Sequence, residues 1–212
     1  MLHFGKKPAK YDSRDLLYAN FRSAAKLPPA PLIFGHGNDF LGEGWKMLGN
    51  GPDSTVAKGF EGCGDCVWAG SAHEVMELNY NAQRPIPLFD GNAVVSEYEA
   101  YCGYDRRDGS KDEGSDVREV MEWRQKKGIK DRAAKVHKIG PYLALEPKNL
   151  EHLYEATWLF ECVGIGFEVP ESAEQQFSES KPWSVVSGAE VVGGHYVPIR
   201  SEERRVGKEC RL

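Results

Sequence analysis

The stretch Gly62-Cys63-Gly64-Asp65-Cys66-Val67-Trp68-Ala69-Gly70-Ser71-Ala72 decides how the rest of the chain is interpreted. Its glycines form a turn before Cys66, and Asp65 is suited to cap a helix that begins there. Apolar residues then follow a helical spacing, at Trp68, Ala72, Val75 and Met76. The sequence therefore predicts a largely buried helix from Cys66 to Tyr80, with a cysteine in its first turn.

A cysteine at this position has a chemical advantage that is limited in size. A helix N-terminus carries about half a positive charge, which favours the thiolate over the thiol. The effect is at most about 2 kcal/mol, which lowers the pKa of a free thiol from about 8.5 to about 7. A strongly activated nucleophile also needs a histidinium beside it. His73 follows on the same helix about 10 Å further along, too far to share a proton with Cys66.

His195 is the candidate partner for Cys66. It stands in the run Val191-Val192-Gly193-Gly194-His195-Tyr196-Val197-Pro198-Ile199, which predicts a strand. Glycines directly before a histidine let a neighbouring backbone or a substrate come close to the imidazole. The two segments together favour nucleophilic catalysis by a cysteine–histidine pair.

Both segments resemble those of papain-like cysteine peptidases. The Cys66 segment is similar to the nucleophile segment of that family, which typically reads Cys-Gly-Ser-Cys-Trp-Ala-Phe-Ser-Ala, and the His195 segment is similar to its Gly-His-Ala-Val. The separation of 129 residues fits the family's order and spacing. Asp12-Ser13-Arg14-Asp15 resembles an Asp-x-Arg-Asp near the start of many bacterial members, and Met47-Leu48-Gly49-Asn50 resembles a segment of uncharacterised phage and bacterial proteins of this type.

The resemblance implies an α+β fold of two lobes, a helical one carrying Cys66 and a β-rich one carrying His195. The change from helical to mixed patterns near residue 130 independently favours α+β. We expect a loop-rich segment over 1–60, the helical lobe over 61–130 and the β-rich lobe over 131–199. The implied activity is acyl transfer on a peptide or amide substrate without cofactor or metal, with Asn50 donating to the oxyanion.

Several residues depart from the family pattern. Phe60 stands where the family has an oxyanion-hole glutamine, and Asp65 places a carboxylate that should raise the pKa of the adjacent thiol. Two alternatives therefore stay open: a papain-fold protein without activity that has a structural or binding role, for example in a phage, and a redox protein that uses Cys63 and Cys66. The resemblance also implies, as one option, a disulfide between Cys63 and Cys102.

The end of the chain has a different character. The residues from Arg200 onward match the in-frame translation of a common short-read sequencing adapter, so 200–212 are expected to be an artefact. The natural protein is then expected to continue past Ile199, and the residue that orients the histidine in papain-like enzymes would lie in that missing part.

Composition excludes several classes of partner. The formal charge of −5 gives no general field for nucleic acid or an anionic membrane, and no apolar run is long enough to span a bilayer. Met1 to Lys10 lacks the apolar stretch of a signal peptide, so a cytoplasmic or virion-associated protein is expected. Cys63-x-x-Cys66 lacks the further ligands that zinc would need. The oligomeric state is not predicted.

Local patterns predict further elements. A short helix is expected near residues 96–101, and Asp116 with Glu119 forms a capping-box pattern that begins a helix over 117–127. Short strands are expected over 133–139 and 142–145.

Overall fold

The computed structural model describes residues 3–25, 27–31, 34–35, 48–51, 55–56 and 58–202. Helices and three two-stranded sheets alternate irregularly along these ranges, which agrees with the α+β class. The elements are α1 (Tyr18–Ala25), β1 (Phe34–Gly35), α2 (Cys66–Asn81), α3 (Gly91–Cys102), α4 (Val117–Lys126), β2 (Ile129–Lys130), β3 (Val136–His137), α5 (Leu150–Phe160), β4 (Val163–Pro170), α6 (Glu171–Ser178), β5 (Val191–Ile199) and β6 (Ser201–Glu202).

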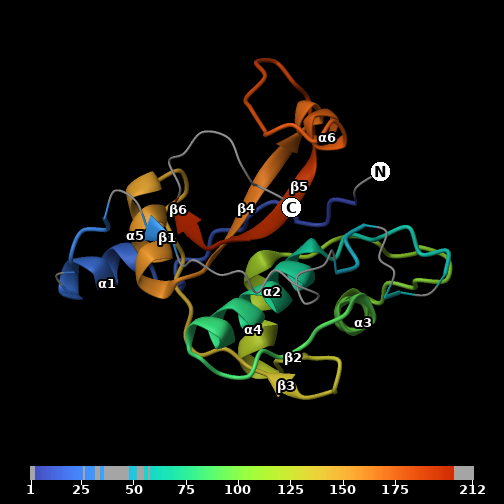
Figure 1. The fold of residues 1–212 in the computed structure, drawn as a ribbon, viewed down its shortest axis with the longest axis horizontal. Helices are drawn as coiled ribbons and strands as arrows, with labels where there is room; N and C mark the ends of the chain where they lie inside the picture. The colour runs from blue at the N-terminus through green and yellow to red at the C-terminus, as the bar shows by residue number, and fades with distance from the viewer. Residues whose placement is uncertain are drawn as a thin grey trace.

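The helix α2 is the central element of the fold. It lies between α3 and α4 on one side and the β4–β5 ribbon on the other (Figure 1). Its first eleven residues, apart from His73, are all buried, and most of them have small or apolar side chains. The predicted helix is thus confirmed, and Cys66 is its first residue.

Side-chain caps define the helices around α2. Asp116 accepts a hydrogen bond from the backbone N–H of Glu119 and begins α4, as the sequence predicts. Asp90 caps α3 in the same way, so this helix begins earlier than the short helix expected near residues 96–101. Asp65 occupies the N-cap position of α2 without a side-chain capping bond, so its predicted capping role is wrong.

The strands β4 and β5 form a long antiparallel ribbon that crosses α2 (Figure 1). The predicted strand over 191–199 is confirmed at both ends. In the ribbon His195 pairs with Phe167, and Tyr196 pairs with Gly166. Successive side chains of a strand point to opposite faces. The Tyr196 side chain contacts α2, where its hydroxyl donates to Glu74, and the His195 ring lies on the other face of the ribbon, against Phe4 and Phe167.

The part of the chain after residue 130 is less rich in strands than expected. The strand expected over 133–139 shrinks to Val136–His137, and 142–145 form no strand but a single bridge between Leu17 and Ala144. The helix α6, which the sequence analysis did not predict, follows β4 directly. Of the expected artefact, Ser201 and Glu202 pair with β1, and 203–212 lie outside the described residues.

Candidate active site

Cys66 lies at the start of α2 with only 1% of its surface exposed. Burial raises the pKa of its thiol to about 12, and the Asp65 carboxylate acts in the same direction. The backbone N–H groups of Gly5 and Tyr196 face the sulfur and oppose this shift. The expected effect of Asp65 on the thiol is therefore confirmed in direction, and desolvation is the larger cause.

His195 reaches the same region from β5. The next residue of the strand, Tyr196, presents the backbone N–H that faces the Cys66 sulfur. The backbone of β5 beside His195 therefore lies close to Cys66. The imidazole packs edge-on against the rings of Phe4 and Phe167. Desolvation lowers the pKa of His195 to about 4, and its Nδ1 is buried without a hydrogen-bond partner in the described part of the chain.

Cys66 and His195 are therefore both neutral near pH 7 in this structure. A thiol whose pKa is raised and an imidazole whose pKa is lowered cannot form the thiolate–imidazolium pair that cysteine hydrolases use. No hydrogen bond joins the two side chains within the described ranges. Burial removes water from both groups and is the main cause of both pKa shifts, so the residues that cover Cys66 and His195 explain why both are neutral.

The N-terminal segment, defined here as residues 3–15, covers this region. The backbone N–H of Lys6 donates to the carbonyl of Gly194 at 2.9 Å, directly before His195. On the other side, Ser115 donates to the carbonyl of Gly5 at 2.6 Å and accepts from the backbone N–H of Lys7 at 2.9 Å. Residues 4–7 thus lie as an extended chain between Ser115 and β5, across Cys66.

Gly5 fits this position because it has no side chain. A Cβ on Gly5 would lie 1.7 Å from the carbonyl oxygen of Gly64, which is a backbone atom that cannot turn aside. Gly114 approaches equally closely, since a Cβ there would lie 2.2 Å from the oxygen of Gly5. Gly194 similarly leaves room for the carbonyl of Lys6. The prediction that glycines before His195 admit a neighbouring backbone is confirmed, and that backbone is the N-terminal segment.

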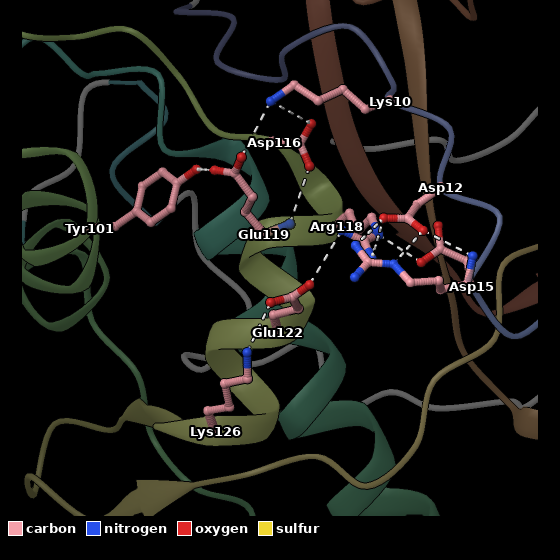
Figure 2. Close-up of polar contacts among 10 residues, drawn as sticks. Lys10, Asp12, Asp15, Tyr101, Asp116, Arg118, Glu119, Glu122 and Lys126 are labelled. Atoms are coloured by element: carbon pink, nitrogen blue, oxygen red, sulfur yellow. Dashed lines mark hydrogen bonds and ion pairs between the residues drawn. The ribbon is translucent and has the colours of Figure 1, made fainter.

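Ion pairs hold the N-terminal segment to α4, as Figure 2 shows. Arg118 contacts Asp12 at 3.0 Å and Asp15 at 2.6 Å, and it also pairs with Glu122 one turn along its helix. Lys10 lies 3.3 Å from Glu119 and 3.8 Å from Asp116. The Asp-Ser-Arg-Asp motif at 12–15 therefore binds α4, a role that its sequence did not indicate.

Asn50 is buried near the start of the N-terminal segment. Its side-chain amide donates to the carbonyl of His3 and, at 3.4 Å, to the carbonyl of Cys63. The amide therefore already binds a peptide carbonyl close to the Cys66 turn, which is the type of contact that an oxyanion donor makes. Phe60 is a partly buried residue packed against the core.

Cys63, Cys102 and Cys162, the other cysteines of the described ranges, are free thiols. Cys63 is fully buried and its thiol contacts the carbonyl of Gly49, and Cys102 contacts the carbonyl of Tyr98. The structure has no Cys63–Cys102 disulfide, so that expectation is wrong for this state of the protein. Burial also raises the pKa of Cys63, whereas a redox-active Cys-x-x-Cys pair has a lowered thiol pKa.

The described ranges contain neither a candidate metal site nor a candidate membrane-spanning helix. There, no group of three or more His, Cys, Asp or Glu side chains is placed to bind a metal ion. No helix among the same residues is both long and apolar enough to cross a bilayer.

Sequence reasoning missed the residues that surround the pair. Gly5 and Ser115 make their contacts across more than one hundred residues of chain, and neither lies in a periodic pattern or a motif. Tyr196 was noted only as part of the histidine segment, although it is the buried residue that joins β5 to α2. Its large aromatic side chain within the predicted strand was the only available signal.

Comparison with known proteins supports the fold. Neither models of protein families nor curated protein sequences match this chain. Its structure is similar to the crystal structure of xylellain, a cysteine protease from Xylella fastidiosa. The TM-score is 0.64 at 15% sequence identity, and the similarity covers 94% of this chain and 80% of that chain. The chain therefore has the fold of a cysteine protease.

Proposed function

We propose that this protein is a cysteine peptidase in which Cys66 is the nucleophile and His195 its acid–base partner. The observation that carries the proposal is the convergence of three features at one place. The sulfur heads a buried helix, the histidine-bearing strand passes directly over it, and an extended peptide lies between them. The fold shared with a cysteine protease supports the same conclusion.

The reaction would proceed by acyl transfer through this pair. The Cys66 thiolate attacks the carbonyl carbon of a peptide bond, and a carbon–sulfur bond forms. The oxyanion is stabilised by the backbone N–H of Cys66 and the side-chain amide of Asn50. Imidazolium of His195 gives its proton to the leaving amine as the carbon–nitrogen bond breaks. Neutral His195 then takes a proton from water, which attacks the thioester; the carbon–sulfur bond breaks, the acid is released, and the thiolate–imidazolium pair is restored.

The N-terminal segment explains why the pair is neutral in the structure. Residues 4–7 occupy the space between Ser115 and Gly194 in which an extended substrate would lie. Departure of this segment would return water to Cys66 and free the His195 ring from Phe4, so that the ring could turn toward the sulfur. Both pKa shifts would then relax, and the thiolate–imidazolium pair could form. The substrate that fits the space is an extended peptide bound through its main chain.

The inactive alternative remains a competing proposal because of two observations. The site is covered, and Cys66 and His195 are not hydrogen-bonded within the described residues. In a binding protein of this fold, the N-terminal segment would stay in place permanently and Cys66 would never react.

Hydrolysis of an unstructured protein such as casein by the full chain tests the proposal. We expect measurable cleavage that Cys66→Ser abolishes and that His195→Ala reduces by at least about a hundredfold, the scale of general acid–base catalysis. Cys102→Ser is the matched control, since this half-buried thiol lies outside the site and its loss should leave the rate unchanged. Equal cleavage by the wild type and Cys66→Ser would contradict the assignment, and so would no cleavage even when the N-terminal segment is displaced.

A further inference from the structure

Tyr196 connects the two parts of the candidate site in an unusual way. Of the buried residues in the hydrophobic cluster around α2, as far as the structure describes it, all except Tyr196 lie between Leu48 and Ile129. Tyr196 is therefore the residue through which the β4–β5 ribbon enters the helical core. It directly follows His195, and its backbone N–H faces the Cys66 sulfur.

The ring of Tyr196 lies along the same face of α2 as Cys66. Residues Cys66, Gly70 and Glu74 are spaced by four, so they form one stripe along the helix. The ring passes Gly70, where a Cβ would lie 2.6 Å from its Cδ1 atom. Its hydroxyl then donates to Glu74 Oε1 at 2.5 Å. The Tyr196 side chain thus contacts α2 about one turn and two turns beyond the nucleophile, at Gly70 and Glu74.

Glu74 is itself fixed by a buried cation. Arg124 of α4, which is 2% exposed, pairs with Glu74 Oε2 at 2.6 Å. The two oxygens of Glu74 are thus divided between β5 and α4. A carboxylate held by a buried arginine is a rigid acceptor, because moving it would leave the arginine charge unpaired.

The ribbon also makes room for the hydroxyl. A Cβ on Gly164 of β4 would lie 1.7 Å from the Tyr196 oxygen. A glycine on β4, a glycine on α2 and an ion pair between α2 and α4 therefore surround one tyrosine side chain. This arrangement fixes the position of β5 along the axis of α2 and the rotation of the strand relative to the helix.

We propose that Tyr196 is a positioning residue that sets the approach of His195 to Cys66 through its contacts with Gly70 and with Glu74, which Arg124 holds in place. The inference rests on the proposed peptidase function. His195 and Tyr196 share a peptide unit, so a shift of the tyrosine ring along α2 moves the histidine by a similar amount. A displacement of about 1 Å is enough to weaken catalysis strongly. Tyr196 touches no reacting atom through its side chain and acts only through the strand.

The experiment measures the alkylation rate of Cys66 by iodoacetamide as a function of pH, with tandem mass spectrometry to distinguish Cys66 from Cys63. All variants carry Gly5→Ala, which displaces the N-terminal segment. The readout is the rate at pH 6 relative to the same protein with His195→Ala. This ratio reports the thiolate that His195 supports, and a change in global stability alone does not move it.

Tyr196→Phe keeps the ring and removes the hydroxyl, and we expect the ratio to fall about tenfold, the equivalent of one charge-assisted hydrogen bond. Gly70→Ala moves the same ring from its other edge without removing a polar atom, so it gives the answer if Tyr196→Phe does not fold. The matched control is Tyr101→Phe, which removes a hydroxyl bonded to Glu119 at 2.5 Å between α3 and α4. We expect the control to keep the ratio.

The outcomes separate the two proposals. A ratio near one in the Gly5→Ala parent would overturn the cysteine–histidine pair and the positioning role together. A high ratio in the parent that persists in Tyr196→Phe and Gly70→Ala would overturn the positioning role alone. A fall in either variant, with Tyr101→Phe unchanged, supports it.

Discussion

Replacement of Gly5 by alanine should uncover the candidate active site. The new Cβ would lie 1.7 Å from the backbone oxygen of Gly64, so the chain at this point must move away by about 1 Å or more to restore a van der Waals contact. The movement breaks the hydrogen bond from Ser115 to Gly5 and the one from Lys6 to Gly194. Each such bond stabilises by about 1 kcal/mol, so the covered form loses about 2 kcal/mol.

This loss has a measurable consequence for Cys66. A change of about 2 kcal/mol raises the uncovered fraction about 30-fold, as long as that fraction remains small. Because Cys66 is 1% exposed in the covered form, its alkylation should proceed through the uncovered one. Iodoacetamide should therefore modify Cys66 about 30 times faster in Gly5→Ala than in the wild type, as followed by mass spectrometry.

Gly140→Ala is the matched control for this prediction. It is the same substitution at a glycine whose added Cβ meets no atom within 4 Å, so its alkylation rate should equal that of the wild type. Equal rates for Gly5→Ala and Gly140→Ala in well-folded proteins would refute the reasoning, because they would show that residues 4–7 do not limit access to the sulfur.

Three further predictions concern pH, charge and burial. The pKa of His195 is lowered to about 4, so the folded protein binds fewer protons than the unfolded chain between pH 6.5 and 4. The melting temperature should therefore decrease as the pH is lowered through this window, and His195→Gln should make that decrease smaller. Arg118→Gln removes the ion pairs of Asp12 and Asp15 with α4 and should speed alkylation about fivefold, since partly exposed ion pairs are worth about 1 kcal/mol at most. An alkylation rate unchanged by Arg118→Gln and by salt would contradict this. Ser115→Ala leaves the buried indole N–H of Trp68 without its partner and should cost about 1–3 kcal/mol in urea unfolding, whereas exposed Ser178→Ala should cost almost nothing.

The elements that carry the candidate pair could be predicted from the sequence for clear physical reasons. The helix from Cys66 has a local turn before it and a helical apolar pattern behind it. The strand over 191–199 is rich in β-branched residues and contains no charged side chain of Asp, Glu, Lys or Arg. These signals are local, so a single sequence displays them. The cap of α4 by Asp116 belongs to the same class.

The parts that sequence reasoning missed depend on distant contacts. The N-terminal segment is held by Ser115, Gly194 and Arg118, which lie far from it along the chain. The clearance that Gly5 provides appears only when Gly64 is beside it. Asp65 failed as a predicted cap although its position was right, because the buried carboxylate does not face the free N–H groups of α2. The strand expected over 142–145 has apolar residues but only one bridging partner.

The pH dependence of Cys66 alkylation in the uncovered Gly5→Ala protein is the most direct test of the proposed pair. We predict rapid modification well below pH 8.5, because imidazolium at position 195 stabilises the thiolate, and loss of this acid-side reactivity in the protein that also carries His195→Ala. A single ordinary thiol ionisation near pH 8.5, identical with and without His195, would contradict the account.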